Sequence, residues 1–440
     1  MTARLGRPSR RALLGGSAAV LAGAGGVAFL SDRRPAVSGG SGPGGSGADG
    51  AGTGGSGTGG SGTGGAGQPA AAPDRDSVSA TPVMVPFYGE HQAGITTRQK
   101  AHVSFVGLDL LPGTDSRDLA GVLAMLTDDA ARLCSGRPPL GALEASSAAA
   151  VAGLTVTFGF GPGLFAAAGV AQRCPEGVRS LPAFATDRLD RRWGQTDLLL
   201  QLCSDDPTGL AYAQRRLLRD AAHVCELRWV QRGFATTGHE PGEPDDASPR
   251  NLLGMRDGSA NERDPAQVAS VAWCAGPGPM AGGTQLVLRR IRLDLERWDD
   301  VDTAAKEMAF GRRVADGSPL SSPAGTSEFT VVDRTASDDQ GFTVVPPNSH
   351  AARAQARSGS ERMLRRGYNY DDGPGADGQR DAGQLFAAYQ ADIGAAFVPV
   401  QRRLAQADAL NTWSTHVGSA VYAVPPGAAP GEWVGQALLT

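Results

Sequence analysis

Hydrophobic and polar positions follow two different periods along the chain from about residue 100 onward. Alternating or continuous apolar runs predict strands at 102–111, 154–160, 197–203 and 227–235. Apolar residues at helical spacing predict helices over 117–133 and 209–223. In chain order these segments read strand, helix, strand, strand, helix, strand, which is the order of a ferredoxin-like module.

The second half of the chain repeats this order. Its first strand is either 269–274 or 285–293, and further strands are expected at 363–370, 384–389 and 419–424. Helices are expected over 302–310 and 397–406. The predicted fold class is therefore α+β, with tandem ferredoxin-like modules over 78–248 and 249–440 whose antiparallel sheets pack together and leave a pocket beside them.

The N-terminal segment is typical of a signal for protein export. Two arginines in the stretch Ser9–Leu14 precede a mildly apolar, glycine-rich run over 15–30. This pattern predicts a twin-arginine export signal over residues 1–37. The alternative, a membrane anchor, would need a longer and more apolar run. We therefore expect the protein to be exported to the periplasm, the cell envelope or the extracellular space.

A low-complexity tract follows the predicted signal. Residues 38–77 are mostly Gly, Ser, Thr and Ala, with few charges and few large side chains. Such a composition cannot bury enough apolar surface to offset the entropy lost on ordering. The tract therefore predicts a flexible linker between the export signal and the folded modules.

Charge and cysteine content narrow the function classes. The formal net charge is −4, so no basic field favours nucleic acid as a partner. The five cysteines are odd in number and show no CxxC spacing, which argues against a disulfide framework or a zinc site. We expect them to be buried thiols.

Three short segments contain residues suited to chemistry, although each is weak alone. Asp257-Gly258 has the composition of an ordinary turn. Arg365-Arg366 would be an exposed charge pair on a strand, and His350 is one of six histidines. Their combination with longer motifs gives them weight.

Those motifs resemble the dye-decolourising peroxidases, a family of haem proteins. GMRDGSAN at 254–261 resembles the GxxDG signature of the family, and Ser349-His350 followed by LRRGYNYDDG at 364–373 resembles its proximal-histidine and distal-arginine segment. Six further stretches resemble the exported deferrochelatase/peroxidase group within the family: 85–95, 154–165, 282–299, 310–313, 397–411 and 431–438. The resemblance runs in order through nearly all of 83–439, and it implies paired ferredoxin-like modules with a haem pocket beside the second.

The resemblance also implies roles for individual residues. His350 matches the ligand of the haem iron, and a carboxylate should fix the orientation of its ring. Asp392 and Asp408 are both candidates for that carboxylate, and their spacing does not choose between them. Asp257 matches the distal acid/base and Arg365 the distal arginine. Arg366 should face away, because neighbours on a strand point to opposite sides.

The same comparison implies which residues bind the rest of the cofactor, expected to be haem b. Arg312 matches an arginine that binds a haem propionate, while Gly258, Ser259 and Ala260 match the haem edge. Gln355, Ala356 and Arg357 match a further haem-binding stretch, in which Gln355-Ala356 replaces the usual Asn-Pro pair before the arginine. Four aromatic residues are candidates for relaying electrons to the surface, with ordinary packing as the alternative: Trp229, Tyr368, Tyr370 and Trp413.

The implied activity is a peroxidase that consumes hydrogen peroxide and a reducing substrate such as a dye or a phenol. Two alternatives remain. The first is a deferrochelatase that releases iron from haem, with iron-uptake transporter components as partners, and the second is a haem carrier without turnover. A homo-oligomer is compatible with any of them. A carrier has no need of Asp257 and Arg365 over an open iron position, so the distal pair favours an enzyme.

Overall fold

The computed structural model describes residues 84–142, 153–236, 243, 246–375 and 377–440. The predicted export signal lies outside the described residues, and so does the predicted linker at 38–77. From Met84 onward the described residues belong to one compact unit. In this part of the chain, none of the helices combines the length and hydropathy needed to span a membrane.

The first half of the described chain forms the predicted strand and helix order. The strands are β1 (His102–Leu110), β2 (Thr155–Phe160), β3 (Leu198–Ser204) and β4 (Cys225–Phe234). The helices are α1 (Ser116–Cys134), α3 (Pro162–Ala167), α4 (Glu176–Arg179) and α5 (Pro207–Ala221), with 3-10 turns η1 (Ala171–Arg173) and η2 (Arg191–Trp193). The strand order β2-β3-β1-β4 is that of a ferredoxin-like sheet, and every pairing in it is antiparallel.

The second half repeats this arrangement with insertions. Its strands are β5 (Thr284–Leu293), β6 (Leu364–Arg365), β7 (Tyr368–Pro374), β8 (Arg380–Gln390) and β9 (Ser414–Val424). Its helices are α6 (Pro265–Ala272), α7 (Leu295–Asp299), α8 (Thr303–Phe310), α9 (His350–Ala354), α10 (Phe397–Ala407) and α11 (Gln436–Leu439), with turns η3 (Gly359–Glu361) and η4 (Ala409–Thr412). The strand order β9-β5-β8-β7 again matches the ferredoxin-like sheet.

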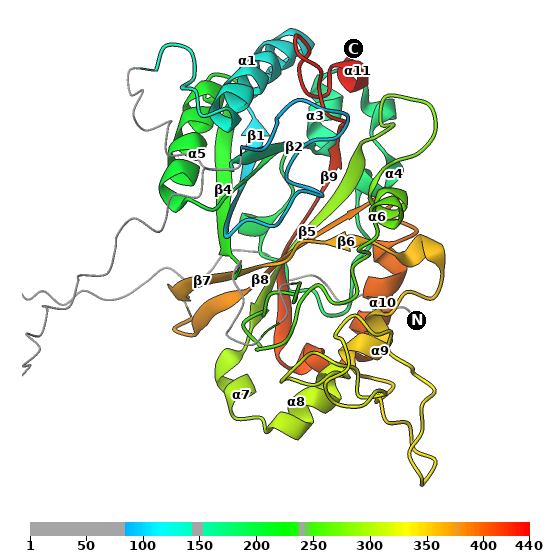
Figure 1. Ribbon diagram of the computed structural model, residues 1–440. Coiled ribbons are helices and arrows are strands. Elements are labelled where there is room, and N and C mark those ends of the chain that lie inside the picture. Colours follow the sequence, from blue (N-terminus) through cyan, green and yellow to red (C-terminus); the bar gives the residue numbers. More distant parts are fainter. Residues whose placement is uncertain (1–83, 143–152, 237–242, 244–245, 376) are drawn as a thin grey trace, which may run out of the picture. The chain divides into compact units, whose positions relative to one another are not determined.

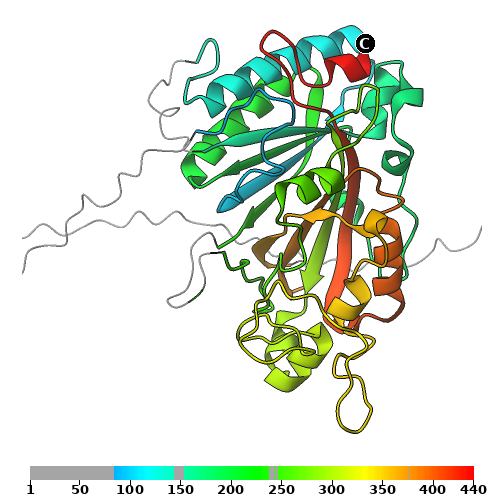
Figure 2. The ribbon, with the colours of Figure 1, turned by 45° about the vertical axis from the view of Figure 1, so that its right-hand side comes forward.

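The two sheets join at both sides into one closed antiparallel barrel (Figure 1 and Figure 2). Each joint is narrow, with Phe160 paired to Ala423 between β2 and β9, and Phe234 paired to Asn369 between β4 and β7. The predicted fold class is confirmed. The predicted division at 248/249 stays a prediction, since the described residues on both sides of it form one compact unit.

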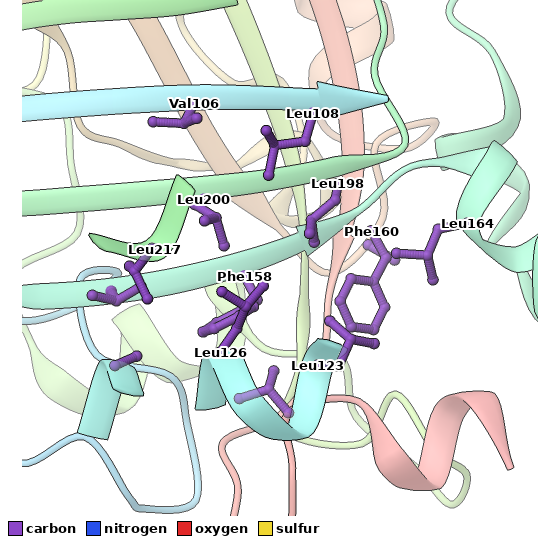
Figure 3. Packing of buried hydrophobic residues seen from close by; sticks show 14 of the residues in the cluster. Val106, Leu108, Leu123, Leu126, Phe158, Phe160, Leu164, Leu198, Leu200 and Leu217 are labelled. Atoms are coloured by element: carbon purple, nitrogen blue, oxygen red, sulfur yellow. The ribbon is translucent and has the colours of Figure 1, made fainter. Parts of the chain in front are cut away.

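Apolar side chains fill the barrel and cover its outside. The interior cluster takes residues from both sheets, among them Phe105, Leu286 and Tyr422. On the outside, α1 and α5 lie side by side over the first sheet (Figure 1), and their leucines interdigitate with β2 and β3 (Figure 3). On the second sheet, Phe397 of α10 packs against Phe386 of β8, with ring centroids 6.2 Å apart.

All five cysteines are free, and four of them are buried, as the sequence predicts. Burial raises the pKa of the Cys134 thiol to about 12, so this residue is an inert part of the core.

Two predictions of secondary structure are wrong in detail. The option of a strand at 269–274 fails because most of this segment lies in α6, where Asp264 caps the helix by accepting from the backbone N–H groups of Ala266 and Gln267. The strand expected over 363–370 is interrupted after Arg365. Gly367, which lies in this break, has its backbone carbonyl bound by the Gln99 side chain rather than by a ladder partner.

Candidate active site

His350 is held at the start of a short helix by contacts on both sides. Ser349 precedes it, and the backbone N–H of Ser349 donates to the carbonyl of Pro346, which closes a turn directly before the helix. The His350 ring packs against Phe310 of α8, with ring centroids 5.8 Å apart. The short helix α9 contacts both α8 and α10, so the imidazole is carried by packed elements.

Asp408 is the carboxylate that orients His350. Its Oδ2 atom lies 2.7 Å from the Nδ1 atom of the imidazole. Asp392 instead accepts from the backbone N–H groups of Gly394 and Ala395. The structure thus decides between the two acids that sequence spacing left open. Because Nδ1 is held by Asp408, Nε2 is the ring nitrogen that would be available to bind a haem iron.

The electrostatic surroundings of His350 bring the distal residues into the same site. Burial lowers the pKa of His350, but the adjacent Asp408 carboxylate outweighs burial, so the pKa is raised overall. Arg365 lowers and Asp257 raises the same pKa, which means that both charges act on the imidazole. The structure therefore brings together the three residues that the sequence assigned to the iron site.

The His350 side chain is only partly covered by protein. About 31% of the His350 side-chain surface is accessible, although protein atoms surround the residue densely. This combination indicates an internal hollow rather than the outer surface. Burial and the nearby Arg365 lower the pKa of Arg312, against an opposing effect of Glu328. Two arginines this close repel each other, and an anionic group between them, such as a haem propionate, would relieve the repulsion.

Arg312 is fixed in place by backbone carbonyls. Its guanidinium donates to the carbonyl oxygens of Gly317 at 2.9 Å and Glu328 at 2.6 Å. Among the described residues, the hydrogen-bond partners of this guanidinium are backbone carbonyls and none is a carboxylate. The donor set therefore fits haem, with one imidazole for iron and one positioned cation at the edge. Within the residues that the structure describes, no cluster of three or more His, Cys, Asp or Glu side chains could hold a bare metal ion.

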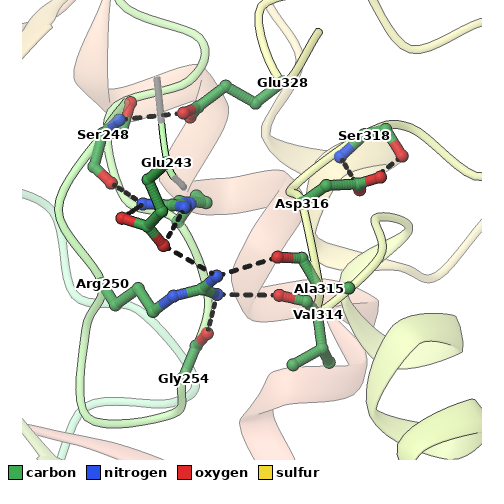
Figure 4. A network of polar contacts seen from close by, with 10 residues as sticks. Glu243, Ser248, Arg250, Gly254, Val314, Ala315, Asp316, Ser318 and Glu328 are labelled. Carbon is green, nitrogen blue, oxygen red and sulfur yellow. Dashed lines mark hydrogen bonds and ion pairs between the residues drawn. The ribbon is translucent and has the colours of Figure 1, made fainter. Parts of the chain in front are cut away.

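The loop that carries Asp257 is anchored by a network of polar contacts (Figure 4). Arg250 donates to the carbonyl oxygens of Gly254, Val314 and Ala315 and pairs with Glu243. Arg256 also pairs with Glu243 and donates to the carbonyl of Ser248. Arg250 thus ties the loop that carries Asp257 to the segment that follows Arg312, while Arg256 ties this loop to Glu243 and Ser248.

Buried Glu328 binds Ser259, which the family resemblance assigns to the haem edge. It accepts from the Ser259 hydroxyl at 2.5 Å and from the Ser248 backbone N–H at 2.9 Å. Gly258 has a φ of 125°, in the region that favours glycine, and Ala260 is exposed. Sequence reasoning missed Glu328, and no motif marks it.

Asn261 links the distal loop to Arg365. Its side-chain nitrogen donates to the Arg365 carbonyl at 2.8 Å, and its side-chain oxygen accepts from the Arg365 backbone N–H at 3.1 Å. This pairing imitates a strand neighbour and fixes the start of the Arg365 side chain. Asn261 is the last residue of the motif GMRDGSAN, so its place in the sequence is a signal that could have identified it.

Arg366 faces the opposite way from Arg365, as strand alternation predicts. Arg366 is 7% exposed. Its positive charge opposes the effect of burial, which raises the pKa values of Cys203, Tyr368 and Tyr389 in the barrel interior. Of the four aromatic residues proposed for electron relay, Trp229, Tyr368 and Tyr370 are buried among the barrel side chains. They cannot present their rings to a bulky substrate at the surface, whereas Trp413 is partly exposed.

The residues after the ligand bind neighbouring segments of the protein. The Gln355 side chain donates to the carbonyl of Val332 at 3.0 Å. Ala356 and Arg357 are exposed, and the Arg357 backbone N–H donates to Glu361. Their predicted part in holding the haem edge stays a prediction.

Family models and similar proteins of known name all point to one family. The model for "Dyp-type peroxidase, N-terminal" matches residues 92–235, and that for "Dyp-type peroxidase, C-terminal" matches 248–429. The chain is 40% identical over 369 residues to a "Dye-decolorizing peroxidase" of Thermobifida fusca (strain YX), covering 79% of this chain and 83% of that protein. It is 32% identical over 390 residues to a "Deferrochelatase" of Escherichia coli (strain K12), covering 84% and 90%.

Solved structures agree. A DyP-type peroxidase from Cellulomonas bogoriensis superposes with a TM-score of 0.77 at 45% identity, covering 81% of this chain and 98% of that one. An oxyferrous complex of DtpA from Streptomyces lividans gives a TM-score of 0.77 at 38% identity, with the same coverage. The chain belongs to the Dyp-type peroxidase family and is therefore an oxidoreductase, a haem peroxidase.

Proposed function

We propose that this member of the Dyp-type peroxidase family binds haem b through His350 and reduces hydrogen peroxide with Asp257 and Arg365. The observation that carries the proposal is the hydrogen bond between His350 and Asp408. The His350 side chain is partly accessible, and its pKa is lowered by Arg365 and raised by Asp257. Arg312 would bind a propionate, with Gly258, Ser259 and Ala260 along the haem edge. The bound haem supplies the two electrons that reduce peroxide, and recovers them from a donor in one-electron steps.

The side chains of this protein transfer the proton of hydrogen peroxide and stabilise the negative charge that develops as its O–O bond breaks. Asp257 takes the proton from one oxygen of hydrogen peroxide and delivers it to the other, which leaves as water. A positioned acid/base of this kind contributes about 10²–10⁴ in rate. Arg365 directs its guanidinium at the oxygen that becomes negative as the O–O bond breaks. Asp408 keeps the imidazole oriented and electron-rich toward iron.

The reductant proposed is a dye or phenol that donates single electrons at the protein surface. Trp413 is a partly exposed aromatic residue that packs on Trp298, with ring centroids 5.1 Å apart. We further propose that the protein is exported folded and loaded with haem, on the strength of the twin arginines at positions 10 and 11.

Iron release from haem is the second candidate. It is favoured by the similarity to a protein named deferrochelatase over 90% of the length of that protein. This activity would need the same imidazole and hollow, and its partners would be iron-uptake components. It differs from the peroxidase in its products, since iron would leave while the porphyrin stays intact.

The test is to load the purified full chain with haem and follow its absorption spectrum with and without hydrogen peroxide. We expect His350→Ala to lose the histidine-ligated ferric spectrum. We expect Asp257→Ala and Arg365→Leu to bind haem normally but to react with peroxide slower by a factor on the order of 10²–10⁴. Wild-type rates in both distal variants would refute the proposal. Free iron and an intact porphyrin as products would favour deferrochelatase.

A further inference from the structure

Gln384 touches Asp257, and nothing in the sequence marks it as a functional residue. Its side-chain amide nitrogen donates a hydrogen bond to the Asp257 Oδ2 atom. We propose that Gln384 is a positioning residue that holds this oxygen, so that Oδ1 faces the haem side and takes the proton. The inference rests on the proposed role of Asp257 as the acid/base.

Strand alternation places Gln384 on the outer face of the barrel. In β8 the neighbouring residues Leu385 and Ala387 belong to the barrel interior, so Gln384 projects outward. It pairs with Asn369 of β7, whose side chain holds the distal loop through the backbone N–H of Leu252 and the carbonyl of Arg250. The amide of Gln384 therefore stands on a rigid strand directly opposite the loop that carries Asp257.

Gly367 leaves the space in which the contact forms. A Cβ atom at this position would lie 2.6 Å from Nε2 of Gln384 and 2.7 Å from Oδ2 of Asp257. Both distances are shorter than any ordinary contact, so every side chain larger than hydrogen would push the pair apart. Gly367 comes two residues after Arg365, so this gap is built into the same segment as the distal cation.

An amide is chemically suited to hold a general base. It donates a hydrogen bond without bringing a full charge, whereas a cation at the same distance would stabilise the carboxylate more strongly and weaken it as a base. Arg250 lines the same small cavity, but its guanidinium is engaged by the carbonyls of Gly254, Val314 and Ala315.

The proposal is tested with Gln384→Met in the haem-loaded full chain. Methionine has nearly the same length but cannot donate, so the carboxylate loses its fixed orientation. We expect the reaction with hydrogen peroxide to slow about tenfold, part of the whole acid/base contribution. Haem affinity and the rate of donor oxidation should stay unchanged. Gln390→Met is the matched control, because Gln390 lies on the same strand and donates to the backbone carbonyls of Gln285 and Ala388.

A second readout needs no turnover. Hydrogen cyanide must give up its proton before the anion binds ferric iron, so the association rate of cyanide reports how well Asp257 accepts a proton. We expect this rate to fall about tenfold in Gln384→Met and not in Gln390→Met. A merely structural role of Gln384 would lower thermal stability in both variants and leave the cyanide rate alone, which would overturn the proposal.

Gly367→Ala provides a variant that keeps the glutamine. Its Cβ should displace the pair and slow both reactions about as much as Gln384→Met. The double variant should be no slower than either single one, because both act through one contact. Multiplied effects would overturn the inference. If Asp257→Ala itself reacts like the wild type, the proposed function fails instead, so the two failures are distinguishable.

Discussion

At the residue scale, the orientation and the pKa of His350 depend on one carboxylate, that of Asp408. Asp408 ends α10 and begins η4, where its other oxygen accepts from the Leu410 backbone N–H at 3.0 Å. The hydrogen bond from Leu410 therefore holds the Asp408 carboxylate in place, independently of its contact with His350. Asp392, at the other end of the same helical segment, is committed to backbone N–H groups. Sequence spacing alone could not separate them, because the choice depends on how α10 packs against α9.

Asp408→Asn should weaken haem binding. The amide keeps the size of the side chain but loses the charge that raises the pKa of His350 and increases its donor strength toward iron. We expect haem affinity to fall about 10–100-fold, measured by titrating apoprotein with haem and following its absorption. Asp392→Asn is the control, since the asparagine side-chain oxygen can still accept from the backbone N–H groups of Gly394 and Ala395. Equal losses in both variants would contradict the assignment.

Single residues were predictable only where a motif surrounds them. His350, Asp257 and Arg365 were assigned by family resemblance, and in the structure the charges of Asp257 and Arg365 both influence the pKa of His350. Gln384 and Glu328 have no motif, because each acts through a contact between segments far apart in the chain. Such contacts become visible only once the sheet register is known.

At the scale of elements, the pair α1 and α5 contains a buried acid pair. Asp129 of α1 is 6% exposed and faces Asp220 of α5. Burial, a shared hydrogen bond and the charge of Asp220 raise the pKa of Asp129 to about 7. One proton held between two carboxyl groups can join the helices, whereas two negative charges repel.

The contribution of this acid pair to the stability of the protein should therefore fall as the pH rises from about 4 to 7. In this range the folded protein holds a proton on Asp129 that the unfolded chain, with an ordinary Asp pKa near 3.8, has released. Asp129→Asn removes the repulsion, so we expect it to raise the free energy of unfolding by about 1–3 kcal/mol at pH 8 and by little at pH 4. Urea denaturation at the two pH values measures this. A gain of the same size at both values would show that the proton is not shared.

Element boundaries were predictable where periodicity is long and uniform. The segments 117–133 and 209–223 gave α1 and α5 within a few residues, since each presents one apolar stripe to a sheet. The errors fall where short apolar runs meet local capping or functional constraints. The segment 269–274 was misread because the Asp264 cap and Pro265 start a helix, and 363–370 because Gly367 gives space to Asp257.

On the scale of the whole molecule, the two modules share one interior. Repetition of the strand order was visible in the sequence, but closure of the sheets into a barrel was not, because it depends on single residue pairs at each joint. Gly233 lies beside the joint between β4 and β7, and a Cβ there would lie 2.8 Å from Cβ of Tyr368 and 2.9 Å from Cγ1 of Val103. Only glycine allows the two sheets to approach at this point.

Gly233→Ala should therefore destabilise the whole unit and disturb the haem site together. The displaced β7 follows directly after Arg365 and Gly367, so strain at the joint reaches the distal residues. We expect a loss of about 1–3 kcal/mol, the usual cost of overpacking, with tryptophan fluorescence and haem absorption changing in one transition at a lower temperature. Gly121→Ala, in α1 with open space around the new methyl, should instead stabilise by up to about 1 kcal/mol. Separate transitions for the two probes would show that the modules unfold independently and that the shared interior does not couple them.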